Sequence, residues 1–337
     1  MKLMYLKNNI KKYFRLNFFI HFVNVTRKLI NFFGGVLLSK SENQHLLEQR
    51  SRLIRELSKL ISPEFKSGLS GLVFSKDRAM QLYAMLETYF KFVENPAPLI
   101  IIYHASNELH EKSYKEVGEL FPKIKLVNEQ FDFRKTLITE LEGIKTANLF
   151  FLTDDNIFIR KINFKYASSL DTSQFTLSLR HSPRLKYNYT TGAKQKPPEF
   201  INLQNQLELM KFNWFEQKHH WSDPWSVDGH VYSTSEILVL SQISDFKAPN
   251  TYESELKTFG HLMIKRPGLC YDKSIILNLP INRVQEEFLN KSGNISVQFL
   301  LDKWNKGYKI NTSIYENSVP ESTHEEHSVN FQKRILL

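Results

Sequence analysis

The chain has 337 residues and a formal net charge of +10, and 42% of its residues are hydrophobic. This length is sufficient for one large domain or two modest ones. Its single cysteine, Cys270, excludes an intrachain disulfide and a cysteine-based zinc cluster. The first forty residues contain eight Lys or Arg and no Asp or Glu, so most of the excess charge lies there. A basic appendage on a nearly neutral enzyme fits this distribution, and we expect no nucleic-acid partner.

Residues 1–40 interleave basic and aromatic side chains, as in LNFFIHFVNV and INFFGGVLL. No apolar run reaches the roughly 18 residues that a membrane span needs, and no signal-peptide pattern is evident. We therefore expect a helical leader whose aromatics enter the headgroup region while Lys and Arg meet anionic lipid. The alternative is that these aromatics pack on the protein's own surface. An amphipathic helix is expected at 43–61, ending before Pro63.

Apolar runs of strand and helix type alternate from about residue 68. This order predicts an α/β fold with a mainly parallel sheet flanked by helices on both faces. The pattern is less regular after residue 165, with a long loop over 185–205 and a polar, irregular tail beyond 312. The expected strands are GLVFS (71–75), LIIIYH (99–104), KIKLV (123–127), NLFFL (148–152), FTLSLR (175–180) and GHVYST (229–234), and the expected helices cover 79–93, 109–121, 134–145, 235–243, 251–259 and 296–306.

Polar segments follow three of these strands: SKDR (75–78), HASN (104–107) and TDDN (153–156). In open α/β sheets, ligands bind beyond the carboxyl ends of the strands. We therefore expect these segments to share one ligand site. Lys76 and Arg78 suit phosphate groups, although both are also compatible with ordinary loop charges.

Asp154, Asp155 and Asn156 directly follow the apolar run of residues 148–152. Carboxylates this close repel each other, which pushes one of them toward protonation unless a cation is bound. Mg²⁺ or Mn²⁺ would relieve the repulsion and could hold a diphosphate. The same residues are also good turn material, so a solvated turn is the alternative.

Neither GxGxxG nor GxxxxGK[ST] occurs in the chain. Their absence from the sequence argues against a dinucleotide dehydrogenase, a P-loop kinase and a typical sulfotransferase. An α/β protein that holds phosphates through a metal rather than a glycine loop fits a nucleotide-sugar enzyme.

The segments GLVFSKDRAMQLYAMLETYF, LIIIYHASN and NLFFLTDDNIF, in this order, resemble the nucleotide-binding half of GT-A glycosyltransferases, especially the family-2-like bacterial enzymes. The resemblance covers roughly residues 70–290. The chain departs from the family in two respects: the DxD motif is imperfect, and Tyr103 and His104 stand where relatives commonly have Asp. The resemblance implies a metal held by Asp154, Asp155 and Asn156, and a nucleotide sugar contacted by Ser75, Lys76, Arg78, His104, Asp154 and Arg180.

A second group of candidates surrounds Asp228, which is followed by a glycine and an expected strand. An inverting transferase needs a carboxylate to accept the proton of the attacking hydroxyl. The resemblance places this base in the later half of the domain, so Asp228 is the first candidate, with Glu253 and Glu255 as alternatives. Trp221 and Trp225 could stack on sugar rings. The alternative interpretation makes Asp228 part of a turn and the tryptophans part of the core.

Other polar clusters give weaker signals. Arg180, His181, Arg184 and Lys186 could bind a diphosphate or a phosphorylated lipid acceptor, and a solvated loop is the alternative. Asn282, Arg283 and Gln285 could line a pocket. HEEH (324–327) is not the HExxH zinc motif, so we expect a solvated tail, with His327 as a possible extra metal ligand.

These expectations define a domain plan and an activity. Residues 1–66 form the leader and amphipathic helix, 67–312 a GT-A-like catalytic domain, and 313–337 a polar tail. Within the catalytic domain, 67–165 is the nucleotide-binding half and 166–312 the acceptor half. The expected enzyme is an inverting, metal-dependent hexosyltransferase that moves a sugar from a nucleotide sugar to a glycan or lipid-linked acceptor. We expect it in the cytoplasm, peripheral on the inner face of a bacterial membrane, in polysaccharide biosynthesis. The alternatives are a nucleotidyltransferase on a related fold and a non-catalytic, membrane-associated scaffold.

Overall fold

The structure is a computed structural model that describes residues 39–129, 132–203, 208–284 and 291–334. The predicted membrane contact of residues 1–40 falls almost entirely outside these residues. The chain divides into two units within helix α2 (Lys40–Ile61), between Leu53 and Ile54, and each unit is considered by itself. The sheet and the candidate site lie in the second unit, which begins at Ile54. No helix among the described residues is both long and apolar enough to cross a bilayer.

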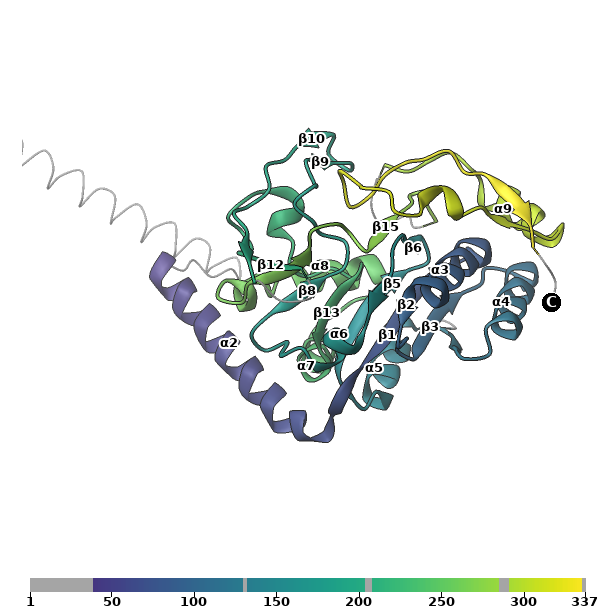
Figure 1. Ribbon diagram of the computed structural model, residues 1–337. Coiled ribbons are helices and arrows are strands. Elements are labelled where there is room, and N and C mark those ends of the chain that lie inside the picture. The colour runs from purple at the N-terminus through teal and green to yellow at the C-terminus, as the bar shows by residue number, and fades with distance from the viewer. Residues whose placement is uncertain (1–38, 130–131, 204–207, 285–290, 335–337) are drawn as a thin grey trace, which may run out of the picture. The chain divides into compact units, whose positions relative to one another are not determined.

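A nine-stranded sheet forms the centre of the second unit (Figure 1). Its strand order is β11-β12-β14-β8-β13-β5-β1-β3-β4, and all strands except β12 and β13 point the same way. The prediction of a mainly parallel sheet flanked by helices is therefore confirmed. The strands are β1 (Lys66–Lys76), β3 (Leu99–His104), β4 (Lys125–Asn128), β5 (Thr146–Thr153), β8 (Thr176–Ser178), β11 (Ile201–Asn202), β12 (Leu209–Phe212), β13 (His230–Ser233) and β14 (Gly268–Tyr271).

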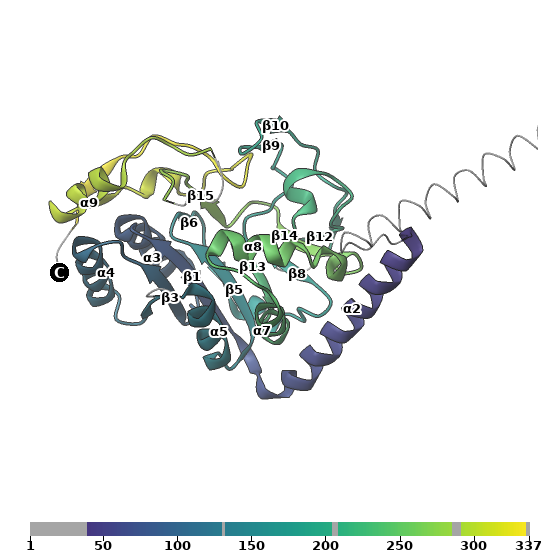
Figure 2. The ribbon, with the colours of Figure 1, turned by 180° about the vertical axis from the view of Figure 1, so that it is seen from behind.

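Helices cover both faces of this sheet (Figures 1 and 2). Val73 and Leu152 point to one face, where α3 (Ala79–Phe92), α4 (Glu108–Leu120) and α9 (Val297–Asn305) pack. Their neighbours Leu72 and Phe151 point to the other face, beneath α5 (Phe133–Gly143), α7 (Thr234–Ile243) and α8 (Pro249–Lys257). The period of two along each strand thus builds two separate apolar cores. The six helices expected in this region are all present, within a few residues of their predicted ends.

Short elements complete the unit. The added strand pairs are β2 (Val93–Glu94) with β7 (Ile162–Asn163), β6 (Asn156–Phe158) with β15 (Ile276–Asn278), β9 (Tyr187–Asn188) with β10 (Ala193–Lys194), and β16 (Tyr308–Ile310) with β17 (Phe331–Lys333). The added helices are α6 (Lys165–Ser169) and the 3₁₀ turns η1 (Ser62–Glu64), η2 (His219–Ser222), η3 (Gly260–Met263) and η4 (Ser313–Tyr315).

The segment beyond residue 312 is more ordered than the sequence suggested. Its last part forms β17, and residues 323–325 run beside β15: Asn278 N donates to Thr323 O at 3.3 Å, and Glu325 N donates to Asn278 O at 3.1 Å. An isolated parallel bridge joins Asn278 to His324. The polar composition concealed this placement, because two-residue contacts on a short strand leave no periodic pattern.

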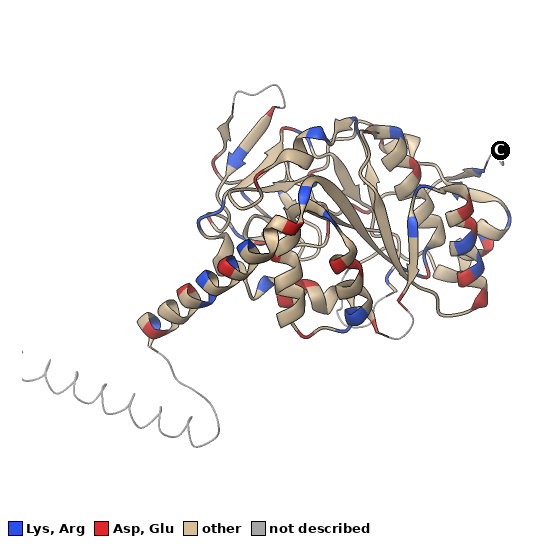
Figure 3. Cartoon of the chain, turned by 90° about the horizontal axis from the view of Figure 1, so that it is seen from below, with Lys and Arg blue, Asp and Glu red and all other residues tan. Residues whose placement is uncertain are grey.

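Charges of both signs are interspersed over the helices on the face that Figure 3 shows. This agrees with the nearly neutral composition of the chain after its first forty residues. The helix α2 ends at Ile61, just before Pro63, as expected. Leu57 and Leu60, on its apolar stripe, are 38% and 76% exposed.

Candidate active site

The carboxyl ends of β1 and β5 bring SKDR and TDDN together. The two strands are parallel neighbours, and Asp154 N continues their ladder by donating to Phe74 O at 3.1 Å. Ser75 Oγ donates to Asp154 Oδ2 at 2.8 Å, and Lys76 N lies 3.4 Å from the same oxygen. SKDR and TDDN therefore meet at the edge of the sheet where ligands bind in open α/β folds.

Arg78 neutralises the two adjacent aspartates, and the three residues form what we call the acidic cluster. Its Nη1 lies 3.0 Å from Asp154 Oδ1 and 3.3 Å from Asp155 Oδ2. Its Nε donates to Asn282 Oδ1 at 2.8 Å, and its Nη2 donates to the Asn282 carbonyl. Burial raises the pKa of Asp154 to about 6, with Asp155 adding to the rise and Arg78 opposing it. The Arg78 guanidinium thus compensates part of the negative charge for which the sequence predicts a bound metal ion.

A strained turn presents Lys76 and Arg78. Asp77 has a φ of 53°, in the left-handed region that non-glycine residues rarely adopt. Its carboxylate accepts from Ser106 N at 2.7 Å and from Ser106 Oγ at 2.5 Å, which ties the turn to the segment after β3. Tyr114 Oη bonds to Ser75 Oγ at 2.6 Å and accepts from Arg78 N at 3.0 Å. Hydrogen bonds from neighbouring strands and helices therefore hold this turn in place.

His104 lies beside this turn at the end of β3. It is opposite Lys76 in the β1–β3 register, and its Nδ1 lies 3.1 Å from Glu129 Oε1. Burial raises the pKa of Glu129, while the nearby charges of His104 and Lys76 oppose the rise. Lys76 itself is exposed, so this edge of the site offers an accessible cation.

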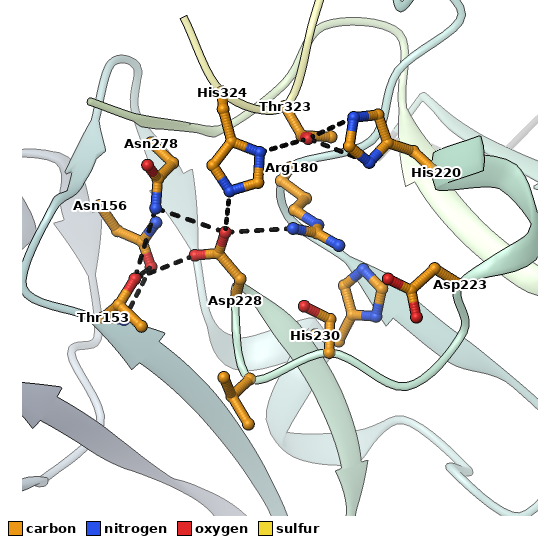
Figure 4. Close-up of polar contacts among 12 residues, drawn as sticks. Thr153, Asn156, Arg180, His220, Asp223, Asp228, His230, Asn278, Thr323 and His324 are labelled. Atoms are coloured by element: carbon orange, nitrogen blue, oxygen red, sulfur yellow. Dashed lines mark hydrogen bonds and ion pairs between the residues drawn. The ribbon is translucent and has the colours of Figure 1, made fainter. Parts of the chain in front are cut away.

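Asp228 is the centre of a second polar group, the Asp228 cluster, at the start of β13 (Figure 4). Gly229 follows it with a φ of 76°, and a Cβ there would collide with the Ile276 side chain. Glycine is therefore required next to Asp228. The Asp228 carboxylate lies 3.1 Å from Arg180 Nη1 and 3.3 Å from His324 Nε2, and it accepts from Thr153 Oγ1 at 3.2 Å.

The environment of Asp228 keeps it ionised. Burial alone would raise its pKa, but the hydrogen bond with His324 and the charges of Arg180 and His324 hold that pKa well below its ordinary value. Arg180 is 4% exposed, and its Nε has no hydrogen-bond partner among the described residues. Arg180 Nε is therefore a buried donor that a ligand oxygen could satisfy.

The acidic cluster and the Asp228 cluster form one network. Thr153 Oγ1 lies 2.7 Å from Asp155 Oδ1 as well as within reach of Asp228. Asn278 Nδ2 donates to Asp155 Oδ1 at 2.7 Å and lies 3.4 Å from Asp228 Oδ2. Asn278 Oδ1 is buried without a partner within the described ranges. Two carboxylates, one from the turn after β5 and one from the segment before β13, are thus linked by one hydroxyl and one amide.

A chain of polar contacts leads away from Asp228 through His324. Thr323 Oγ1 lies 3.0 Å from His324 Nδ1 and 3.1 Å from His220 Nε2 (Figure 4). Burial lowers the pKa of His220 well below its ordinary value, and the charge of Arg180 lowers it further, so this ring is neutral. His324 is 27% exposed, which leaves it open to a ligand at its outer side.

Several sequence candidates lie apart from this network. Trp221 and Trp225 are fully buried, so they belong to the core and are not sugar-stacking surfaces. Glu253 Oε1 accepts a hydrogen bond from Ser226 Oγ at 2.7 Å, so it stabilises the segment before Asp228. Arg184 is exposed and pairs with Asp272, and His181 is buried, so the predicted RHSPRLKY cluster is divided.

The three predicted metal ligands differ in how well they fit a divalent cation. Asn156 is fully buried, and its Oδ1 accepts from Thr153 N at 2.9 Å. Oxygens of both Asp154 and Asp155 already accept hydrogen bonds, but Asp154 is only 3% exposed, whereas the Asp155 side chain is 14% exposed. Asp155 is therefore the residue that fits a metal best. No group of three His, Cys, Asp or Glu side chains in the described part of the chain is placed to hold a metal alone.

Sequence reasoning missed His324, Asn278 and Thr153. The HEEH motif indicates the right segment, but the histidine predicted there as an extra metal ligand, His327, lies 3.1 Å from Glu325 Oε2 instead. The sequence predicts for Asn282 only a place in the lining of a pocket. The available signal for Asn278 was its position at the end of an apolar run, ILN, where a polar side chain meets the same edge of the fold.

The sequence is similar to that of a glycosyltransferase. The relative is the bifunctional glycosyltransferase pgtA of Dictyostelium discoideum, with 26% identity over 190 residues. The alignment covers 51% of this chain, which spans only a quarter (25%) of the length of this curated relative. No protein-family model matches the chain. The similarity to pgtA confirms the resemblance to glycosyltransferases.

Comparison with solved structures gives distant likenesses. S. aureus TarS in complex with UDP-GlcNAc has a TM-score of 0.41 and 13% identity, covering 65% of this chain and 60% of TarS. A nucleotidyl transferase from Methanothermobacter has a TM-score of 0.37 and 6% identity, and the match covers 62% of this chain and 89% of that protein. A mannosyltransferase of Pyrobaculum calidifontis, in complex with GDP-Man and Mn²⁺, has a TM-score of 0.29 and 13% identity, and the match covers 41% of this chain and 48% of that protein. No functional conclusion follows from likenesses of this size.

Proposed function

We propose that this protein is a glycosyltransferase that moves a hexosyl group from a nucleotide sugar to a glycan or lipid-linked acceptor. One observation carries the proposal: Asp155, in the turn after β5, and Asp228, in the segment before β13, share the donors Thr153 and Asn278. The proposed phosphate-binding edge thus adjoins a buried anion beside a partly exposed histidine. The similarity to pgtA over half of the chain supports the same class of reaction.

The nucleotide sugar binds at the carboxyl ends of β1, β3 and β5 in this proposal. Lys76 is exposed beside His104, and this pair faces the diphosphate. Ser75, Arg78 and Asp154 form the buried floor, and the unpartnered Arg180 Nε donates to an oxygen of the donor. The proposed catalytic domain comprises residues 67–312, with the nucleotide-binding half at 67–165, and the segment around His324 adds to its site.

Mg²⁺ or Mn²⁺ is proposed at Asp155, the most exposed of the three predicted ligands. When bound, the ion would neutralise charge on the leaving diphosphate. The diphosphate would have to supply further ligands, because Asp154 and Asn156 are buried, at 3% and 0% exposed. The part of this chain is to place one carboxylate next to Thr153 and Asn278, which fix its orientation.

Asp228 and His324 act together on the acceptor in this proposal. Asp228 stays anionic, so it orients His324 through Nε2 and stabilises the imidazolium. The histidine takes the proton of the acceptor hydroxyl at Nδ1, where that hydroxyl replaces the contact with Thr323 Oγ1. The acceptor oxygen forms a bond to the anomeric carbon as the bond from that carbon to the diphosphate breaks. Attack from the side opposite the diphosphate inverts the anomeric centre. This proposal gives the proton-accepting role, which the sequence predicted for Asp228, to His324, and keeps Asp228 as the anion that orients it.

Membrane association is proposed for residues 1–40, which would hold the enzyme in the cytoplasm on the inner face of a bacterial membrane. The support is the eight basic residues interleaved with aromatics in that segment. Full-length protein should sediment with vesicles containing anionic lipid, and protein lacking residues 1–38 should not. Equal sedimentation of both forms would contradict this assignment.

The test of the activity is a panel of UDP-, GDP-, CMP- and dTDP-sugars incubated with the full chain and Mn²⁺. We expect release of the free nucleotide from one donor class, at a rate reduced at least about hundredfold in Asp228→Asn, in line with loss of acid–base assistance. Pyrophosphate-linked products would favour the nucleotidyltransferase alternative. Absence of both turnover and donor binding across the panel would refute the enzyme assignment and favour a scaffold.

A further inference from the structure

A cleft adjoins His324 on the side away from Asp228. It has a volume of about 610 Å³, and its walls come from the loop around β9 and from residues 321–328. This volume lies within the range of small-molecule sites, about 300–1,000 Å³. We call it the tyrosine cleft, after Tyr187 and Tyr189, which line it together with His324.

The walls of the tyrosine cleft are joined by hydrogen bonds. Lys186 N and Tyr187 N both donate to Glu321 O, at 2.8 and 3.1 Å, and Tyr189 N lies 3.3 Å from Ser322 Oγ. Tyr189 Oη donates to Glu326 Oε2 at 2.9 Å. These bonds connect two segments more than 130 residues apart in the sequence. The cleft is therefore a built feature of the fold.

The lining suits a sugar. Tyr187 is 36% exposed and offers an aromatic ring, to which the apolar C–H face of a pyranose can stack. Lys291 Nζ lies 4.6 Å from the centre of the Tyr189 ring, so that ring already carries a cation. Carboxylates and hydroxyls along residues 321–328 provide hydrogen-bond partners for the hydroxyl groups of a saccharide.

The charge of the lining indicates which kind of sugar. Three glutamates, Glu321, Glu325 and Glu326, line the cleft with a single lysine, Lys291. Such a surface repels phosphate and carboxylate groups and tolerates neutral or amino-bearing ones. Glu321 is exposed, so its charge acts on whatever enters.

We infer that the tyrosine cleft binds a neutral or amino-bearing saccharide, and that this saccharide is the acceptor. The second half of the inference rests on the proposed function, whereas saccharide binding itself does not. A sugar stacked on Tyr187 lies in the cleft that His324 also lines, so one of its hydroxyls can approach the imidazole. Phosphate-bearing acceptors are disfavoured, so a lipid-linked acceptor would be recognised through a neutral sugar distant from its phosphates.

The first experiment measures binding without a donor. Saturation-transfer NMR with the full chain and the methyl glycosides of neutral hexoses and N-acetylhexosamines is compared with their 6-phosphates. We expect the neutral sugars to bind, and Tyr187→Ala to weaken binding by about tenfold, or about 1.4 kcal/mol. Tyr187→Phe keeps the ring and should restore most of the affinity. Preferred binding of the phosphates, or unchanged binding by Tyr187→Ala, would overturn the inference.

The second experiment measures transfer at saturating donor. We expect kcat/KM for a neutral glycoside to exceed that of its 6-phosphate by about tenfold or more. Glu321→Lys should narrow this ratio, whereas Glu119→Lys, an exposed glutamate on α4, should leave it unchanged. An unchanged ratio in Glu321→Lys would contradict the charge argument.

The two experiments separate failure of this inference from failure of the proposed function. Donor hydrolysis without saccharide binding would leave a glycosyltransferase whose acceptor site lies elsewhere. Saccharide binding that depends on Tyr187, without use of any nucleotide sugar, would leave a sugar-binding cleft and remove the acceptor assignment.

Discussion

Replacing Arg78 with methionine tests whether the acidic cluster is held by its arginine. The Arg78 and Asp154 side chains are 11% and 3% exposed, and their atoms lie 3.0 Å apart. Removing one partner of a buried ion pair costs about 3–5 kcal/mol, because the remaining charge loses its compensation. We therefore expect Arg78→Met to lower the free energy of unfolding by about this amount. The double variant Arg78→Met/Asp154→Asn should recover much of it, since the most deeply buried charge is removed and Asp155, 14% exposed, keeps its hydrogen bonds from Thr153 and Asn278.

The pH dependence of this loss has a defined sign. Burial raises the pKa of Asp154 to about 6, above its ordinary value of 3.8. A carboxyl whose folded-state pKa is raised adds stability below its unfolded pKa and loses it as the pH rises through the folded pKa. Removing Arg78 takes away the cation that favours the anion. The cost of Arg78→Met should therefore be small near pH 4.5 and largest above pH 7.

The assay is urea unfolding followed by circular dichroism at pH 4.5, 6 and 7.5, in EDTA so that no metal contributes. Arg266→Met is the matched control, because Arg266 forms a buried pair with Glu236, at 2.6 Å, outside the candidate site. It should cost a similar free energy of unfolding, yet the folded protein should keep its affinity for nucleotide sugars. Equal losses in the single and double Arg78 variants at pH 7.5 would refute the reasoning.

Three further predictions concern single residues. Gly229→Ala should destabilise the protein by about 2–4 kcal/mol in urea unfolding, because its φ of 76° and the nearby Ile276 side chain both exclude a Cβ; a variant as stable as the parent would contradict this. His324→Gln should lower kcat for transfer by about 10²–10⁴ while the donor Kd stays close to that of the parent; an unchanged kcat would exclude His324 as the proton acceptor. Lys76→Ala should weaken nucleotide-sugar binding by about tenfold in calorimetry, with a loss that shrinks at high salt; equal affinities at low salt would remove Lys76 from the donor site.

The central strands and their polar ends were predictable from the sequence. The runs that became β1, β3 and β5 are apolar, short and separated by helical patterns, which is typical of parallel strands. Because parallel strands end at one edge, the position of SKDR next to TDDN followed from their order alone. The same argument placed His104 beside Lys76.

The partners of the acidic residues were not predictable in this way. The sequence shows which charges exist, but whether Arg78 or a metal compensates Asp154 depends on side-chain geometry at distances of a few ångströms. The sequence could not show whether Trp221 and Trp225 belong to the core or to a sugar site, because burial and stacking use the same apolar surface.

The contribution of the C-terminal segment was hidden for a different reason. His324 reaches Asp228 from almost a hundred residues away, in a segment without helix or strand periodicity. A single bridge to Asn278 places it, and one bridge leaves no repeating pattern to detect. The tyrosine cleft depends on the same segment, so it could be found only from the folded structure.

The most direct test of the account is calorimetric titration of the full chain with the nucleotide sugar that it hydrolyses, in the presence of Mn²⁺, repeated with Asp155→Ala. The account predicts saturable binding by the parent, at least about tenfold weaker in the variant, because Asp155 is the carboxylate at the donor site that fits a metal. Equal affinity in both proteins, or no binding of any nucleotide sugar by the parent, would contradict it.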